Sequence, residues 1–372
     1  MFYVLLTYLI SPILYLLLFF RQREDVENIL IIQTAKIGDL ICSTPVFREI
    51  KKKYPYSQIT VIVNPDTKAL LEYNPHVNKI ISIKASDFKG LSGKIWLSNL
   101  IRKGHYDIAI CLNPNVPFSI ALFWGLVPIR ISVMPNFAGV TFKLASVFYT
   151  YLEKHISGQL VIETYMKMLK AIGIDSSDIT KEVYKSENAD AIGQQILRGI
   201  NKPLIGIAVS SGNKLKELGA EKIIKLIDML LDDIDAYVVL IGSEQDKNTA
   251  NLILDATSKR DRIINATGKL NLKELPALVE RLSLFIGVDT GITYMADALN
   301  IPLINIAGPS NMEDQRPLGE KVFIIQKNLS CVPCSHSFKA PYKCKIHNRS
   351  CIETVTTEEI YNAVKKLFIP TS

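Results

Sequence analysis

Short runs of β-branched and aliphatic residues alternate with amphipathic stretches along most of this chain, and this alternation constrains its fold more than any other feature. The runs lack the polar–apolar alternation of a strand that faces water on one side, so they predict strands buried on both faces, as in a parallel sheet. Strands that alternate with helices in this way build doubly wound α/β domains. Ligands of such domains bind beyond the carboxyl ends of the strands.

The predicted strands fall into two groups. The first group is 29–33, 59–63, 79–83, 107–112 and 129–133, with helices such as 40–54 and 91–103 between them. The second group is 204–209, 236–242, 263–265, 284–288 and 303–306, and the polar stretch 186–202 connects the two. A chain of 372 residues suggests two domains, at about 150 residues each. We place them at 25–190 and 191–350, with an interdomain cleft. A last amphipathic helix in 351–372 would be able to pack back on the first domain.

Composition excludes several classes of protein. Hydrophobic residues make up 48% of the chain and charged residues 21%, which is enough apolar side chain for a large core and argues against disorder. A net charge of +7 suits an anionic membrane or a phosphorylated ligand. The chain has no basic stripe with interleaved aromatic residues, so we expect no nucleic-acid partner.

The first 20 residues carry no charge, and a helix of this length would be about 30 Å long, close to the thickness of a hydrocarbon core. No basic residue precedes the run and no small-residue cleavage site follows it, which disfavours a cleaved signal peptide. Arg21 and Arg23 come next, so the positive-inside rule places the rest of the chain in the cytoplasm. We therefore expect a single-pass anchor at 1–24. The alternatives are a hairpin bent at Pro12 and a helix packed on a partner.

Three loops that follow predicted strands carry polar residues suited to chemistry. In the loop at 34–39, Asp39 is either the cap of the next helix or a general base. In the loop at 210–216, small residues and lysines would form an anion site or a solvated surface. In the turn at 287–296, backbone N–H groups at a helix start would bind phosphate, unless the turn is an ordinary helix cap. A fourth turn, 307–311, could close the same pocket. None of these loops is a Gly-x-Gly-x-x-Gly fingerprint, so a dinucleotide cofactor is not indicated.

Taken together and in order, these elements resemble glycosyltransferase family 9, the lipopolysaccharide heptosyltransferases. The resemblance rests on Ile37-Gly38-Asp39 with Thr44-Pro45, the lysine loop, Asp289-Thr290-Gly291, Gly308-Pro309 and a Cys-rich C-terminal segment. It covers about residues 28–368. It implies a GT-B fold, a nucleotide-diphosphate heptose donor, and inversion at the anomeric carbon without a metal.

The resemblance also implies roles for individual residues. Asp39 matches the catalytic base, and Lys216 matches the lysine that neutralises donor phosphate, although Lys-Glu-Leu-Gly stands here in place of the usual Lys-Arg-Trp-Pro. Tyr294 stands where the family usually has His. The positions matched to donor binding are Ser211, Gly212, Asp246, Leu270, Asp289, Thr290, Gly291 and Tyr294.

Four cysteines are clustered near the C-terminus. Cys331, Cys334, Cys344 and Cys351 form a C-x2-C-x9-C-x6-C array, and clustered thiols in a cytoplasmic protein are more typical of zinc than of disulfides. A structural zinc ion in segment 331–351 is one interpretation of this array, and free thiols and disulfides are the alternatives. Cys42 and Cys111 lie in predicted core segments.

The sequence therefore predicts a glycosyltransferase anchored in the inner membrane, with its catalytic domains on the cytoplasmic side. Its expected donor is ADP-heptose, and its expected acceptor is a lipopolysaccharide core or another lipid-linked saccharide. The other hypothesis is a catalytically weak homologue that binds nucleotide or glycolipid and acts as a scaffold in surface polysaccharide assembly.

Overall fold

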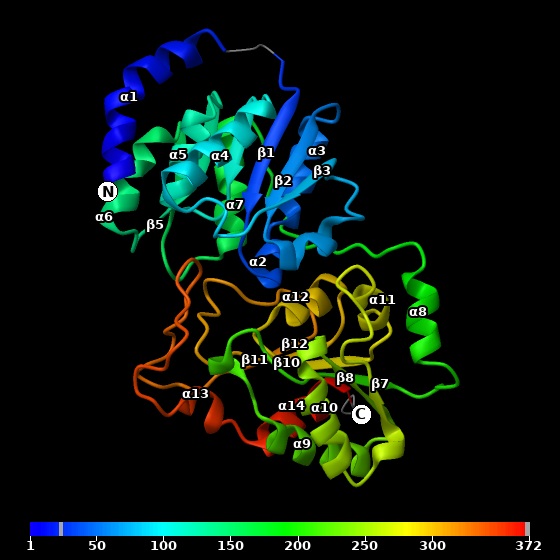
Figure 1. The fold of residues 1–372 in the computed structure, drawn as a ribbon. Helices are drawn as coiled ribbons and strands as arrows, with labels where there is room; N and C mark the ends of the chain where they lie inside the picture. The colour runs from blue at the N-terminus through cyan, green and yellow to red at the C-terminus, as the bar shows by residue number, and fades with distance from the viewer. Residues whose placement is uncertain (22–24, 369–372) are drawn as a thin grey trace. The chain divides into compact units, whose positions relative to one another are not determined.

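The computed structural model describes residues 1–21 and 25–368, and the chain divides into two compact units, Met1–Lys181 and Glu182–Ser372. This division falls before the boundary we placed at residue 190. Arg23 and the end of the expected anchor at residue 24 lie outside the described residues. Figure 1 shows the helices and strands of both units.

The first unit begins with a helix and continues as an α/β fold. Its strands are β1 (Asn28–Gln33), β2 (Gln58–Val63), β3 (Lys79–Ser82), β4 (Ile108–Cys111), β5 (Ile129–Pro135) and β6 (Tyr151–His155). Its α-helices are α1 (Phe2–Phe19), α2 (Ile37–Ile41), α3 (Thr44–Lys53), α4 (Gly90–Lys103), α5 (Val116–Trp124), α6 (Val140–Ala145) and α7 (Val161–Met168). Short 3-10 helices are η1 (Pro65–Leu71), η2 (Ser146–Phe148) and η3 (Leu169–Ile172).

The sheet of the first unit has the strand order β3-β2-β1-β4-β5-β6, and its described strand pairs are all parallel. Central strand β1 is buried from Ile29 to Gln33, as its unbroken aliphatic run predicts. The order of connection reverses between β1 and β4. The loops that follow these two strands are therefore the place where a ligand of this unit is expected.

The second unit has the same plan. Its strands are β7 (Leu204–Ala208), β8 (Tyr237–Ile241), β9 (Ile263–Asn265), β10 (Leu284–Val288), β11 (Leu303–Ile306) and β12 (Val322–Ile325). Its α-helices are α8 (Ala189–Ile196), α9 (Ala220–Asp233), α10 (Lys247–Ala256), α11 (Leu275–Val279), α12 (Gly291–Ala298), α13 (Ser350–Glu353) and α14 (Thr357–Phe368). Its 3-10 helices are η4 (Lys214–Lys216), η5 (Glu244–Asp246) and η6 (Arg260–Arg262).

The sheet of the second unit runs β12-β11-β10-β7-β8-β9, again with parallel pairs throughout the described strands. Its order of connection reverses between β7 and β10, which pair at Phe285 with Gly206. The loops after β7 and β10 therefore lie side by side at one edge of the sheet. The prediction of parallel, doubly wound α/β architecture is confirmed.

Three features of the fold differ from the sequence expectations. Edge strand β6 was not predicted, because it is only partly buried and lacks an unbroken aliphatic run, and edge strand β12, a run of only four apolar residues, was also missed. The single helix expected at 40–54 is two helices, α2 and α3. Pro45 has no N–H to donate to the carbonyl of Ile41, and the Thr44 hydroxyl donates to that carbonyl instead, at 2.8 Å.

Helix α1 is long and apolar enough to cross a membrane, a test that signal sequences and buried core helices also pass. In the structure one side of α1 packs on the first unit (Figure 1). Val4, Leu14 and Leu18 are buried against α5, α6 and η2. The buried Trp124 Nε1–H donates to Thr7 Oγ1 at 3.0 Å. The opposite side of the helix is exposed.

The C-terminal helix α14 belongs to the core of the second unit. Its buried residues Ile360, Ala363 and Val364 join the same apolar cluster as Leu226 of α9 and Ile306 of β11. The apolar face of α14 lies in this core, where the helix covers β11 and β12.

Candidate functional site

The switch point of the second unit gathers residues from three separate loops. Lys216 lies on η4 in the loop after β7, Asp289 directly follows β10, and Ser310 lies in the turn after β11. Because β7, β10 and β11 are neighbours in a parallel sheet, the three loops emerge at the same edge. Ligands of doubly wound units bind at this edge, beyond the carboxyl ends of the strands.

Lys216 and Asp289 form an ion pair at this edge. Nζ of Lys216 lies 2.5 Å from Oδ2 of Asp289 and 3.4 Å from the Asp289 carbonyl oxygen. The side chains are only 14% and 9% exposed, so the pair is poorly screened by water. The pair fixes the lysine ammonium beside the first turn of α12.

Two hydroxyl groups hold the Asp289 carboxylate in place. Ser310 Oγ donates to Oδ2 at 2.5 Å, and the hydroxyl of Tyr294 donates to Oδ1 at 2.7 Å. The Tyr294 hydroxyl also lies 3.2 Å from the carbonyl oxygen of Gln315. Tyr294 is 2% exposed, so its visible role is to orient Asp289. Sequence reasoning did not single out Ser310, although it lies in the turn at 307–311 that was expected to close the pocket.

The N-terminus of α12 carries hydrogen-bond donors without protein partners. Thr290 Oγ1 is buried and has no hydrogen-bond partner within the described part of the chain. The first N–H groups of any helix lack intrahelical acceptors and carry partial positive charge. Thr290 and Gly291 open α12, so these donors lie next to the Lys216–Asp289 pair. Such an arrangement suits an anionic group such as a phosphate.

The loop after β7 has an exposed glycine between two ordered polar residues. A Cβ built on Gly212 would meet nothing within 4 Å, so the backbone here is open to a ligand. Ser211 Oγ accepts a hydrogen bond from the N–H of Asn213 at 3.3 Å. Asn213 Nδ2 in turn donates to the carbonyl of Pro341 at 3.0 Å, which ties this loop to the Cys-rich segment.

Asp246 and Leu270 lie outside this hydrogen-bonded group. Asp246 Oδ2 accepts bonds from the N–H and the hydroxyl of Ser243, both at 2.7 Å, and thereby caps η5 after β8. Burial would raise the pKa of Asp246, but hydrogen bonds from Ser210 and Ser243 outweigh it and lower that pKa. Leu270 is half-buried in the loop between β9 and α11. Among the described contacts, none joins either residue to the Lys216–Asp289 pair.

The first unit holds Asp39 at its own switch point, in the first turn of α2. Asp39 Oδ2 accepts a hydrogen bond from the N–H of Lys36 at 3.2 Å, so the carboxylate caps the helix. Asp39 remains partly exposed after this contact. On the neighbouring strand, Asn113 Nδ2 donates to Thr34 Oγ1 at 3.2 Å and joins the loops after β1 and β4. The cap and the exposure are compatible with one another, since a carboxylate has further lone pairs to offer.

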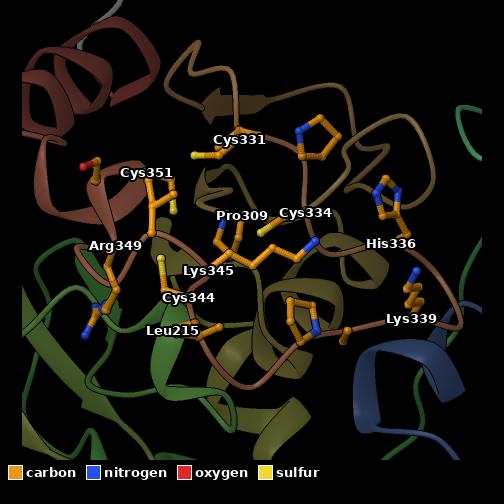
Figure 2. A pocket seen from close by; sticks show the side chains of 16 residues that line it. Leu215, Pro309, Cys331, Cys334, His336, Lys339, Cys344, Lys345, Arg349 and Cys351 are labelled. Carbon is orange, nitrogen blue, oxygen red and sulfur yellow. The ribbon is translucent and has the colours of Figure 1, made fainter.

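The four clustered cysteines line a cavity of about 410 Å³ (Figure 2). Cys331, Cys334, Cys344 and Cys351 are free thiols. Within the described residues, no group of three or more His, Cys, Asp or Glu side chains could hold a metal ion. Zinc needs ligands within about 2.3 Å of one point, and these thiols border a wider space instead. The zinc site suggested by their spacing is therefore not formed by this arrangement.

The Cys-rich segment supports the loops of the switch point. The N–H groups of Cys334 and Ser335 both donate to the carbonyl of Pro309 at 3.0 Å, next to Ser310. Arg349 Nη2 donates to the carbonyl of Glu217, which follows Lys216. The segment thus braces both the Lys216 loop and the Ser310 turn. The contacts of Arg349 with Glu217 and of Pro341 with Asn213 connect residues more than 100 positions apart, so no local sequence pattern predicts them.

Comparison with known proteins identifies the class. The model of glycosyltransferase family 9 (heptosyltransferase) matches residues 96–344. Lipopolysaccharide heptosyltransferase 3 of Escherichia coli is 26% identical over 290 residues, which cover 75% of this chain and 83% of that protein. The crystal structure of a family 9 glycosyltransferase from Veillonella parvula superposes with a TM-score of 0.77 at 23% identity, covering 94% of this chain and 99% of the other. The structure of E. coli ADP-heptose lps heptosyltransferase II superposes with a TM-score of 0.71 at 20% identity, covering 91% of this chain and 98% of the other.

The two doubly wound units, each with a switch point between its central strands, form a GT-B-like fold. The sequence match then gives the particular family. The chain belongs to glycosyltransferase family 9, the heptosyltransferases.

Proposed function

We propose that this enzyme transfers a heptose from ADP-heptose to a lipopolysaccharide core or another lipid-linked saccharide, with inversion at the anomeric carbon. The names of its relatives support this assignment, since they are lipopolysaccharide heptosyltransferases. Transfer requires a base to accept the proton of the acceptor hydroxyl, and positive charge to stabilise the departing diphosphate. Both kinds of group are present at switch points of this chain.

The Lys216–Asp289 pair beside the N-terminus of α12 is the observation that carries the proposal. In the proposed complex the donor diphosphate accepts hydrogen bonds from the N–H groups of the 289–293 turn and from Thr290 Oγ1. Lys216 supplies positive charge from a position that Asp289 fixes in advance, so little reorganisation is needed during transfer. Ser211 and the open backbone at Gly212 bind phosphate from the loop after β7. Asp246 receives the ribose and Leu270 contacts the base.

We assign the proton acceptor to Asp39. Its carboxylate is exposed at the carboxyl end of β1, and the hydrogen bond from Lys36 N–H fixes the direction of one oxygen. The acceptor hydroxyl would approach the carboxylate from its partly exposed side. As the bond between the anomeric carbon and the diphosphate breaks, the hydroxyl oxygen forms the new glycosidic bond and Asp39 takes its proton.

We further propose that the enzyme works at the cytoplasmic face of the inner membrane and that α1 attaches it there. The uncharged sequence of α1 and the net charge of +7 support attachment to an anionic membrane surface. A lipid-linked acceptor would then be presented in the plane of the same membrane.

Calorimetric titration of the full chain with ADP, GDP, UDP and CDP tests the donor assignment. We expect ADP to bind most tightly and Lys216→Ala to weaken it by at least about tenfold. Lys214→Ala is the matched control, because that lysine lies in the same loop but is 84% exposed and pairs with Glu217 rather than with Asp289. Tighter binding of another nucleotide would assign a different nucleotide to the donor. Binding of none of the four would favour the scaffold hypothesis.

A further inference from the structure

The outward side of α1 is an apolar surface. None of the described residues of the first unit covers it. Leu9 is 79% exposed and Ile13 is 64% exposed, and Leu16 is also exposed. At 3.6 residues per turn, these three residues lie opposite the buried stripe of Val4, Thr7, Leu14 and Leu18. A helix that is apolar on all sides needs apolar surroundings on all sides, and the first unit supplies them on one side only.

The neighbouring elements extend this surface. The hydroxyl of Tyr8 donates to the carbonyl of Leu144 in α6 at 2.9 Å, so α1 and α6 lie side by side. Val140 at the start of α6 is 70% exposed, and Val147 of η2 is exposed as well. We define the α1 surface as the exposed side chains of Leu5, Leu9, Ile13, Leu16, Val140 and Val147. Apolar patches of this extent on a folded unit are typical of membrane or protein contact sites.

The charges around the α1 surface are all of one sign. Helices α1, α4, α5 and α6 with η2 contain no Asp or Glu, and they carry Lys94, Arg102, Lys103 and Lys143. Lys143 is exposed on α6, and Arg102 and Lys103 are exposed at the end of α4, whereas Lys94 is buried beside the ring of Tyr3. Cations that border an apolar face are complementary to a bilayer with anionic headgroups, where each adds about 1 kcal/mol to binding.

The contacts of α1 with the first unit also argue against a helix that crosses the bilayer. Crossing would separate the buried Trp124 Nε1–H from Thr7 Oγ1 and Arg21 Nη1 from the carbonyl of Gly125. It would also expose the stacked rings of Phe123 and Phe148, which the buried side of α1 covers. A helix in the plane of the interface keeps all these contacts and places only its outward side in lipid.

We propose that α1 binds an anionic phospholipid surface as an in-plane helix, docked on the first unit, and does not span the membrane. This inference concerns attachment and does not depend on the donor or acceptor assigned above. It replaces the single-pass anchor that hydrophobicity alone predicted, because the packing of one side of the helix is now included.

Flotation of the full chain with vesicles of phosphatidylcholine, with and without phosphatidylglycerol, tests the surface. The variant Leu9→Glu/Ile13→Glu/Leu16→Glu should lose at least about tenfold in binding to the anionic vesicles. The matched control, Tyr56→Glu/Tyr73→Glu/Leu252→Glu, places the same charge on three exposed apolar residues elsewhere and should bind as the unmodified chain does. An unchanged circular dichroism spectrum and urea unfolding midpoint in both variants show that they remain folded. This control does not require ADP binding, so it separates this test from that of the proposed function.

Protease digestion of sealed inverted inner-membrane vesicles then distinguishes in-plane from spanning attachment. An in-plane helix leaves tags at both chain ends open to the protease, and extraction at alkaline pH releases the protein. Protection of the N-terminal tag would overturn the proposal in favour of a span. Retained vesicle binding by the α1 variant would also overturn the proposal. So would a dimer of the unmodified chain in the absence of lipid, if the α1 variant were a monomer, because a second copy of the chain would then cover the α1 surface.

Discussion

Lys216 Nζ lies 2.5 Å from Asp289 Oδ2, although the two residues are 73 positions apart in the sequence. The adjacency of β7 and β10 brings their loops together, and Ser310 and Tyr294 set the direction of the carboxylate. The carboxylate therefore holds the ammonium group beside α12. Both the stability of this edge and its affinity for a diphosphate should depend on the pair.

Replacing Asp289 with Asn should weaken both properties. The substitution leaves a largely buried ammonium group without its counter-charge, which should cost about 2 kcal/mol of unfolding free energy. Urea unfolding followed by circular dichroism measures this cost, and calorimetry should show at least about tenfold weaker ADP binding. The control is Asp235→Asn, which removes an exposed carboxylate paired with Lys202 and should change stability by no more than about 0.5 kcal/mol. Equal effects of the two substitutions would contradict the structural role of the pair.

Replacing Asp39 with Asn should abolish turnover and leave ADP binding nearly unchanged. The amide cannot accept the proton of the acceptor hydroxyl, so the rate should fall by a factor of about 10² to 10⁴. Asp87→Asn is a matched control, because Asp87 Oδ2 accepts a hydrogen bond from Lys84 N–H just as Asp39 Oδ2 does from Lys36 N–H. Normal turnover in the Asp39 variant would remove this residue from the mechanism.

The cap at Asp246 should make stability depend on pH in the acid range. The hydrogen bonds from Ser243 and Ser210 hold the pKa of Asp246 below its usual value, despite the opposing effect of burial. A lowered pKa in the folded state adds stability above the usual pKa, and this stability is lost as the pH falls through the folded-state pKa. Asp246→Ala should therefore cost about 1 kcal/mol near neutral pH.

Urea unfolding at a series of pH values measures the dependence. The difference in unfolding free energy between the unmodified chain and Asp246→Ala should become smaller below the usual aspartate pKa of 3.8. Asp246→Asn is the control, because an amide oxygen still accepts a hydrogen bond at every pH. A difference that stays constant down to acid pH would show that the carboxylate charge contributes nothing to the cap.

Among the cysteines that border the cavity, Cys344 should react faster with iodoacetamide than Cys334 and Cys351. A hydrogen bond from the N–H of Arg349 is the main cause of its lowered pKa, and the N–H groups of Ile346, Asn348 and His347 add to it against a small opposing effect of burial. Burial raises the pKa of Cys334 and Cys351, and the neighbouring thiols raise them further. Because the thiolate is the nucleophile, the order of modification should follow these shifts.

Mass spectrometry of the alkylated peptides gives this order. Cys111 serves as an internal control within the same sample, since complete burial raises its pKa to about 11 and it should stay unmodified in the folded chain. Faster labelling of Cys351 than of Cys344 would contradict the assigned role of the backbone N–H groups.

Much of the fold was predictable because its determinants are local. The core strands β1, β2, β7, β10 and β11 are rich in aliphatic residues, and their predicted limits lie within one residue of those observed. The positions of Asp39, Lys216 and Asp289 after strands of parallel sheets also followed from the pattern. The edge strand β6 was not predicted, since partial burial leaves its side chains mixed in character. The edge strand β12 is a run of only four apolar residues, Val-Phe-Ile-Ile, and was also missed.

The sequence by itself determined two parallel α/β units and the loops that carry polar chemistry, because hydrophobic periodicity and turn residues act over a few positions. The tertiary structure alone decided what those residues contact. It paired Lys216 with Asp289, tied Asn213 to Pro341, spread the four thiols around a cavity, and laid one side of α1 on the first unit through Thr7 and Trp124. Each of these contacts joins distant parts of the chain, and only the packing of buried apolar surface brings such parts together.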